Sequence, residues 1–398
     1  MSVTADDVAA ARERIADVAR PTPVLPSATL TDRLGASIAL KAENLQRTGS
    51  FKVRGATNKV SALGDRCAAG VVAGSAGNHA QALAHAAHAR GVPCEVFMPA
   101  GAPLSKIEGA EALGAKVIVG GDSVLDCLAA ATARADEARM TVVHPFDDPD
   151  VIAGQGTLGL ELLDDVPDLA KVVVPIGGGG LSSGVAIALK AARPEIEVVG
   201  VQVETCAPFA DQPVDAARSL TIADGIAVKR PGRITLPLVR EWVDEVVTVS
   251  EEQIAEAMVL LLEKAKQVVE GAGAVGVAAL MFERTPPAAE GTTVAVLSGG
   301  NVDAGLLADV ARRHETEVGR RLLVQSRIGD RPGELASLLA VVGEQGANLI
   351  EVQHVREGLD LHVRETAVQL VLETRGRDHA AAVLEAIRAG GYEARVLR

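Results

Sequence analysis

The chain lacks most of the features that mark secreted, membrane-bound or metal-stapled proteins. Its four cysteines, Cys67, Cys94, Cys127 and Cys206, are scattered without the close spacing of a zinc site or a disulfide framework, which favours a reducing compartment. No apolar run reaches the roughly 18 residues of a membrane span. The N-terminus lacks the basic and apolar regions of a signal peptide. We therefore expect a cytoplasmic protein with no membrane partner.

Basic residues are also scarce relative to acidic ones, 39 against 52, which gives a formal net charge of −13 at pH 7. Such a chain is a poor partner for nucleic acid or an anionic surface, so we expect neither. Aromatic residues make up only 2% against 48% hydrophobic residues, so Ala, Val, Leu and Ile must build the cores. A length of 398 residues predicts two or three domains.

Short apolar strands alternate with helices over some 230 residues, which predicts an α/β architecture with buried parallel strands. Before this region, Thr4 and Asp7 resemble a capping pair, and helical periodicity continues to about Ala19. The strands are too many for one sheet, so we expect two α/β lobes. Strands are predicted at 71–75, 94–99 and 115–119, near Val142, Val173, Val199 and Val246, and at 292–297; helices are predicted at 78–90, 104–113 and 122–138.

The last 80 residues change character after a charged connector at 312–317. They read as strand, helix, strand, strand, helix, strand, which is the βαββαβ order of a ferredoxin-like module. The predicted strands are 322–328, 348–355, 367–373 and 393–397, and the predicted helices are 333–344 and 379–389. A small module behind a complete α/β unit is typically regulatory or oligomerising.

Lys52, in the heptapeptide SFKVRGA at 50–56, is the candidate for covalent chemistry. A lysine amine is protonated at neutral pH, so an enzyme that uses one must lower its pKa by desolvation or by nearby positive charge. Lys52 follows Phe51 and has Arg54 two positions on. Taken alone, the heptapeptide favours a lysine in a surface loop, which is the usual place of a single lysine.

Three strand-to-helix turns could supply partners for such a lysine. Gly177, Gly178, Gly179 and Gly180 follow an apolar strand and precede a helix, which predicts a phosphate cradle rather than a simple tight turn. Neither dinucleotide nor nucleotide-loop spacing is present, which favours a smaller phosphorylated cofactor. The turn at 74–79 could hold a carboxylate, and the turn at 297–301 places Ser298 at the carboxyl end of a strand. As isolated residues, His79 and Ser298 would more often be structural.

An amine, a phosphate cradle, a carboxylate turn and a polar strand end together suit pyridoxal phosphate chemistry on an amino acid. SFKVRGA, SAGNHAQ, GGGGL and LSGGN, in this order, resemble the fold-type II pyridoxal phosphate enzymes, which are tryptophan synthase β-like, and among them the threonine dehydratases (threonine ammonia-lyases). The resemblance spans about residues 10–315. The tail, with DRPGEL at 330–335, resembles an ACT regulatory domain, as in the medium-length form of the enzyme.

The resemblance implies a catalytic domain at 1–318, with a smaller lobe at about 44–142, and an ACT domain at 319–398. Lys52 would form the imine bond to pyridoxal 5′-phosphate and then remove the substrate α-proton. Phe51 would pack on the cofactor ring, Asn78 would bond its 3-hydroxyl, and Ser298 would face its nitrogen. Gly177, Gly178, Gly179, Gly180 and Leu181 would hold the phosphate. The implied substrate-binding residues are Ser75, Ala76, Gly77, Asn78, His79 and Gly225, with Glu270 also lining the site.

The implied reaction converts L-threonine to 2-oxobutanoate and ammonia, with L-serine as a second substrate. The resemblance also implies that the enzyme is a homodimer or homotetramer and that an amino-acid effector binds at the ACT domain. Related serine racemases carry a serine where this chain has Ala76, so racemisation should be poor here. Their divalent-cation site uses acidic groups where Gln202 and Pro208 stand, so we expect no metal. Serine or hydroxyaspartate dehydratase, serine racemase and a non-catalytic amino-acid sensor remain alternatives, as do catabolic and isoleucine-biosynthetic duties.

Overall fold

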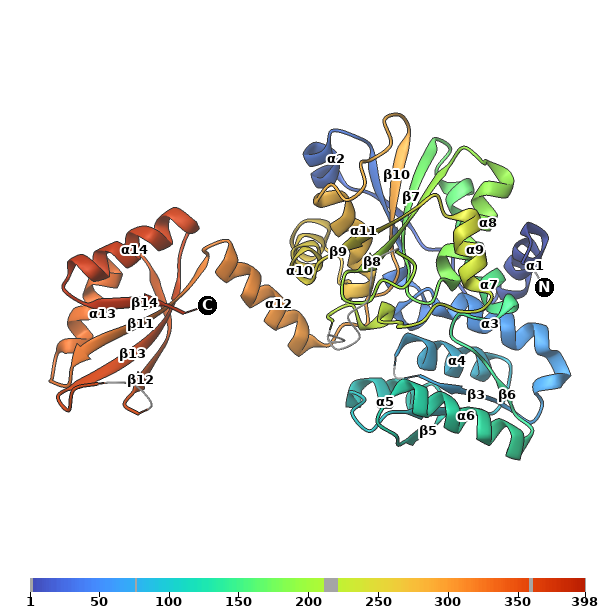
Figure 1. Ribbon diagram of the computed structural model, residues 1–398, viewed down its shortest axis with the longest axis horizontal. Coiled ribbons are helices and arrows are strands. Elements are labelled where there is room, and N and C mark those ends of the chain that lie inside the picture. Colours follow the sequence, from blue (N-terminus) through green and yellow to red (C-terminus); the bar gives the residue numbers. More distant parts are fainter. Residues whose placement is uncertain (1–2, 76, 211–220, 358–360, 398) are drawn as a thin grey trace. The chain divides into compact units, whose positions relative to one another are not determined.

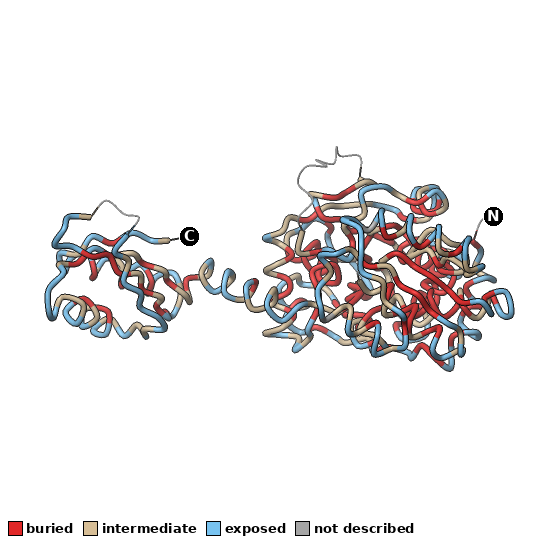
Figure 2. The backbone as a smooth tube through the Cα atoms, turned by 90° about the horizontal axis from the view of Figure 1, so that it is seen from below, coloured by how far each residue is buried: buried red, intermediate tan, exposed pale blue. Residues whose placement is uncertain are grey.

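The structure is a computed structural model that describes residues 3–75, 77–210, 221–357 and 361–397. The chain divides into two compact units, Met1–Asp303 and Ala304–Arg398, which we describe separately. Buried residues concentrate along the strands and inner helix faces of each unit (Figure 2). None of the helices in the described ranges is long and apolar enough to cross a lipid bilayer.

The smaller sheet of the N-terminal unit has four parallel strands in the order β5-β4-β3-β6 (Figure 1). Alanine-rich helices cover one face, where α4 and α5 pack on Val71, Ala73 and Val96. Helix α6 covers the other face against Val72. The elements are β3 (Val71–Gly74), α4 (Asn78–Ala89), β4 (Cys94–Met98), α5 (Leu104–Ala112), β5 (Lys116–Val119), α6 (Val124–Ala138) and β6 (Thr141–Val142).

The larger sheet has six strands in the order β1-β2-β10-β7-β8-β9, all parallel except the edge strand β1. Helices α7, α8 and α9 bury their apolar residues on one face. Helix α11, which is buried along its whole length, lies on the other face. The strands are β1 (Val24–Pro26), β2 (Ile38–Ala42), β7 (Leu169–Pro175), β8 (Glu197–Val203), β9 (Glu245–Val249) and β10 (Thr292–Leu297).

The helices of this part are α2 (Ala28–Leu34), α7 (Pro149–Asp165), α8 (Gly180–Ala192), α9 (Thr235–Trp242), α10 (Glu251–Leu260) and α11 (Gly271–Met281). Short helical turns are η1 (Glu43–Leu45), η2 (Arg47–Gly49), η3 (Gly64–Cys67), η4 (Asp224–Ile226) and η5 (Leu261–Ala265). The N-terminal helix α1 (Ala5–Ile15) has the predicted capping box between Thr4 and Asp7 but ends four residues before Ala19. The two predicted α/β sheets are thus confirmed.

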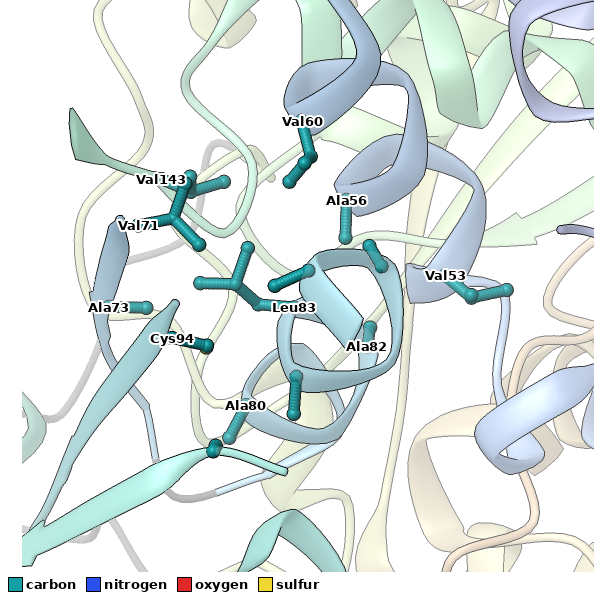
Figure 3. Packing of buried hydrophobic residues seen from close by; sticks show 14 of the residues in the cluster. Val53, Ala56, Val60, Val71, Ala73, Ala80, Ala82, Leu83, Cys94 and Val143 are labelled. Atoms are coloured by element: carbon teal, nitrogen blue, oxygen red, sulfur yellow. The ribbon is translucent and has the colours of Figure 1, made fainter. Parts of the chain in front are cut away.

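Helix α3 (Lys52–Leu63) carries the lysine and packs against α4, which covers the smaller sheet, and α7, which covers the larger one. Val53, Ala56 and Val60 are buried in the cluster that holds Ala80 and Leu83 of α4 (Figure 3). Small alanine side chains let the two helices approach closely. Because Lys52 and Asn78 are the first residues of these two helices, the packing fixes both in the same region.

The C-terminal unit confirms the ferredoxin-like prediction. Its sheet has the order β12-β13-β11-β14 with every neighbouring pair antiparallel. The elements are β11 (Arg321–Gly329), α13 (Glu334–Glu344), β12 (Asn348–Val355), β13 (Glu365–Glu373), α14 (Arg377–Ala389) and β14 (Glu393–Val396). The charged stretch at 312–317, predicted as a connector, is helical and forms the end of α12 (Ala304–Glu317), where Arg313 pairs with Glu317 one turn further along.

Candidate active site

Lys52 lies at the first turn of α3, with its amine turned into the protein. Its Nζ donates a hydrogen bond to the main-chain oxygen of Pro145 at 2.8 Å and stands 5.2 Å from the ring centre of Phe51. Burial lowers the pKa of Lys52 to about 8, although the carboxylate of Glu270 acts in the opposite direction. The amine is therefore a far better nucleophile near neutral pH than a solvated lysine, and the surface-loop interpretation is wrong.

Arg54 does not supply the positive charge that its spacing suggested. Its guanidinium is almost fully buried and pairs with Glu43 at 2.7 Å and Glu161 at 2.6 Å. Lys41 bonds to Glu161 and Asp165 in the same group. We call Lys41, Glu43, Arg54, Glu161 and Asp165 the ion-pair cluster. Its carboxylates neutralise Arg54, so desolvation is what lowers the pKa of Lys52.

Asn78 begins α4 and is joined to two other polar side chains. Its Nδ2 donates to Oε1 of Glu270 at 2.7 Å, and its Oδ1 accepts from Nδ2 of Asn301 at 2.8 Å. Burial raises the pKa of Glu270 to about 7, with the charge of Asp224 adding to the effect and the Asn78 hydrogen bond opposing it. Glu270 can therefore exchange a proton near neutral pH.

The tetraglycine turn joins β7 to α8 as predicted, and each of its glycines has little room for a side chain. A Cβ at Gly178 would collide with the ring of Phe146, and Gly179 has φ +90°, in the left-handed region. Glycines thus let this backbone pass close to Phe146. The first N–H groups of α8, at Gly180 and Leu181, face out of the helix end without intrahelical acceptors, as an anion site requires.

Ser298 and Gly225 also reach this region. Ser298 is buried at the end of β10, and its Oγ has only a 3.5 Å contact with the oxygen of Ala272. Its main-chain oxygen accepts from Phe51 N at 3.0 Å, which ties the strand end to the lysine. A Cβ at Gly225 would stand 3.4 Å from Glu270 Oε1, so this glycine lies beside the carboxylate.

The turn at 75–79 is only partly described, because Ala76 lies outside the described residues. The Oγ of Ser75 accepts from Gly77 N at 3.3 Å, and a Cβ at Gly77 would meet no atom within 4 Å, so the turn borders open space. The ring of His79 is buried and its Nε2 lies 2.9 Å from the oxygen of Val143. Burial and the charge of Lys52 lower the pKa of His79 to about 3, so its side chain is a neutral structural group.

The segment 144–147, which follows β6, was missed by the sequence reasoning. It contributes the Pro145 oxygen that holds Lys52 and the Phe146 ring that packs on Gly178. His144 holds the segment in shape, since its Nδ1 accepts from Phe146 N and Asp147 N. Its position directly after a parallel strand was the available signal.

The described residues contain no group of three or more His, Cys, Asp or Glu side chains arranged to hold a metal ion. Gln202 instead has a structural role, because its Oε1 accepts from Phe209 N at 2.9 Å and from Ala210 N at 3.2 Å. Pro208 lies in the same turn.

The site thus combines a desolvated amine, a helix end suited to a phosphate, a second helix end beside open space, and a buried serine hydroxyl with a weak partner. These residues fit a small phosphorylated carbonyl compound such as pyridoxal 5′-phosphate, because the amine can bond to its carbonyl carbon while α8 binds its phosphate. We call Lys52, Asn78, Glu270 and Ser298 the lysine cluster.

Comparisons with known proteins also indicate a pyridoxal phosphate enzyme. A family model described as "Pyridoxal-phosphate dependent enzyme" matches residues 15–299. The L-threonine ammonia-lyase of Thermotoga maritima is 44% identical over 99% of this chain and 100% of its own. Among solved structures, a threonine deaminase of T.th. has a TM-score of 0.70 and 42% identity over 75% of this chain and 99% of its own. Maize serine racemase has a TM-score of 0.74 and 34% identity over 80% and 99%.

Proposed function

The chain belongs to the family of pyridoxal-phosphate dependent enzymes, and we propose that it is an L-threonine ammonia-lyase that forms 2-oxobutanoate and ammonia. The observation that carries this is the buried amine of Lys52, with a pKa lowered to about 8, among polar groups suited to the cofactor. The 44% identity to the Thermotoga maritima ammonia-lyase, over 99% of this chain, supports the choice of reaction. We place the enzyme in the cytoplasm.

The bound cofactor supplies an electron sink for the α-carbon of the amino acid. The neutral amine of Lys52 would hold the cofactor and would accept the α-proton of the substrate. The N–H groups at the start of α4 would bind the substrate carboxylate, and those at the start of α8 would bind the cofactor phosphate. Phe51 would pack on the cofactor ring, and Gly225 would line the substrate pocket. The β-hydroxyl would leave with a proton as water, and one water would then hydrolyse the resulting enamine to the 2-oxo acid and ammonia.

Ser298 favours elimination over transamination. It offers a neutral hydroxyl where the resemblance places the ring nitrogen, and a hydroxyl stabilises a protonated ring nitrogen less than a carboxylate would. Negative charge at the α-carbon is then short-lived, and expulsion of the β-hydroxyl is the faster outcome. Asn78 would donate a hydrogen bond to the oxygen of the ring hydroxyl.

Serine racemase is the second candidate, because the maize enzyme has the higher TM-score of the two solved structures. Alanine at position 76 argues against it, since its side chain has no proton donor for the opposite face of the α-carbon. A serine or hydroxyaspartate dehydratase would use the same cluster.

A substrate panel tests the reaction. We expect the highest kcat/KM for L-threonine, with L-serine lower by up to about 200-fold, because one methyl group is worth about 1–3 kcal/mol. The assay measures 2-oxo acid formation from threonine, serine and hydroxyaspartate, and D-serine formation from L-serine. A higher kcat/KM for serine or hydroxyaspartate, or D-serine as the main product, would overturn the threonine assignment.

We also propose that residues 319–398 form an ACT domain that binds an amino-acid effector in a homodimer or homotetramer. The βαββαβ sheet and its separate core support this. Deletion from residue 319 should leave threonine turnover and remove an effector response of about 5- to 150-fold in substrate affinity. The T.th. threonine deaminase is matched over 99% of its length by 75% of this chain, which makes an active truncated chain reasonable. Unchanged regulation by branched-chain amino acids after deletion would refute the proposal.

A further inference from the structure

The side chain of Asn78 is the middle member of a chain of three polar side chains. Nδ2 of Asn301 donates both to the main-chain oxygen of Thr48 at 2.7 Å and to Oδ1 of Asn78 at 2.8 Å. Nδ2 of Asn78 in turn donates to Oε1 of Glu270 at 2.7 Å. Asn301 therefore donates to both of its neighbours, and from Asn301 the hydrogen bonds run through Asn78 to the carboxyl group of Glu270.

This arrangement permits only one orientation of the Asn78 amide. The Thr48 carbonyl can only accept, so it fixes the NH₂ end of Asn301 toward itself and toward Asn78. A flipped Asn78 would set its NH₂ group against the NH₂ group of Asn301 and its oxygen against Glu270. The first contact would replace a hydrogen bond with a repulsion at any pH, and the second would do so whenever Glu270 is ionised, which costs more than losing the bond alone.

The backbone at 299 holds these groups at close range. A Cβ at Gly299 would stand 2.5 Å from Glu270 Oε1 and 3.2 Å from Asn78 Nδ2, so only glycine leaves room for the pair. Gly299 also accepts from Glu270 N at 3.1 Å and bridges to Ser50, two residues before the lysine. The orientation of Asn78 is therefore built into the loop that also positions Lys52.

We propose that Asn301 and Glu270 are positioning residues that hold the Asn78 amide so that its second N–H is presented as a donor to the oxygen of the cofactor ring. The inference rests on the proposed function, because it assumes that Asn78 meets the ring hydroxyl of pyridoxal 5′-phosphate. Asn301 itself need not touch the cofactor. Its role is to exclude the orientation in which Asn78 would present an acceptor to that hydroxyl.

Two substitutions of Asn301 separate orientation from packing. Asn301→Ala removes the donor, whereas Asn301→Asp keeps the shape but places acceptors against both Thr48 O and Asn78 Oδ1. We expect pyridoxal 5′-phosphate to bind about tenfold more weakly to Asn301→Ala and more weakly still to Asn301→Asp. The pH midpoint of the visible cofactor band should move upward in both, because the ring oxygen loses a donor that stabilises its ionised form.

Asn44→Ala is the matched control. Asn44 is half-buried like Asn301 and makes two amide hydrogen bonds, to Gln267 and Val268, on the neighbouring loop. It should leave both the cofactor affinity and the midpoint unchanged. The measurements are titration of cofactor into apoenzyme, a pH titration of the visible band, and urea unfolding to confirm that each variant folds.

Equal affinities and midpoints in the wild type and both Asn301 variants would overturn the inference, as would a milder effect of Asp than of Ala, since that order indicates a packing role. A folding failure of Asn301→Ala leaves the nearly isosteric Asp variant to decide the question. Failure of the proposed function is distinct: the wild-type protein would then bind no pyridoxal 5′-phosphate and form no 2-oxo acid.

Discussion

Lys52 and Arg54 lie two residues apart on one helix, and both side chains are withdrawn from water. Their surroundings shift the two pKa values in opposite directions. Burial disfavours both charges. In the ion-pair cluster, the carboxylates of Glu43 and Glu161 outweigh that effect and raise the pKa of Arg54 above its usual value. In the lysine cluster, Lys52 has a neutral carbonyl as its hydrogen-bond partner, and its pKa falls to about 8.

The difference between the clusters is the number and state of the carboxyl groups. Arg54 has two carboxylates in direct contact. Lys52 has only the influence of Glu270, whose own pKa is raised to about 7. Withdrawal from water therefore gives a permanently charged structural group in one cluster and a reactive amine in the other.

Removing Lys52 should have the largest effect on activity. Lys52→Ala should lose the visible cofactor absorbance and reduce kcat by at least about 10²–10⁴-fold, the usual contribution of a general base alone. The matched control is Lys59→Ala on the same helix, whose amine pairs with Asp148 and Asp150. Absorbance spectra and 2-oxo acid assays measure the result. Full activity of Lys52→Ala would show that Lys52 is not the reactive amine.

Removing Arg54 should have the largest effect on stability. Arg54→Met leaves Glu43, which is fully buried, without its cationic partner and should lower the free energy of unfolding by about 3–5 kcal/mol. Urea unfolding measures the loss. The control is Arg12→Ala, which breaks an exposed ion pair with Asp164 and should cost about 0–1 kcal/mol. Similar losses of unfolding free energy in Arg54→Met and Arg12→Ala would show that burial does not make the Arg54 ion pairs more important for stability than the exposed Arg12 pair.

The smallest expected effect is a shift in the pH dependence of cofactor capture by the apoenzyme. Only the neutral amine attacks, so the rate should rise about tenfold per pH unit below pH 8 and level off above it. Because Glu270 raises the pKa of Lys52, Glu270→Gln should move this midpoint to lower pH. Stopped-flow absorbance follows the capture.

Asp165→Asn is the control for the capture measurement, because it removes a carboxylate of the ion-pair cluster instead. Its midpoint should match that of the wild type. A midpoint that moves upward in Glu270→Gln, or moves equally in both variants, would contradict the assignment of Glu270 as the carboxyl group that acts on Lys52.

Much of the fold could be predicted because its determinants are local. The strand–helix alternation, the capping box of Thr4 and Asp7, and the βαββαβ order of the tail depend on apolar periodicity and on turn residues. The predicted end of the first helix at about Ala19 was wrong, since α1 ends at Ile15, and the sequence pattern did not indicate that 312–317 is helical.

The sequence by itself determined where the family's motifs lie, since SFKVRGA, GGGGL and LSGGN are short motifs whose positions can be read directly. Only the tertiary structure decided what surrounds them. Arg54 is turned from Lys52 into the ion-pair cluster, His79 bonds to Val143, and Pro145, Glu270 and Asn301 meet the site from distant positions. Desolvation and hydrogen-bond direction depend on these long-range contacts, and so the chemistry of Lys52 is set by the fold rather than by its neighbours in the chain.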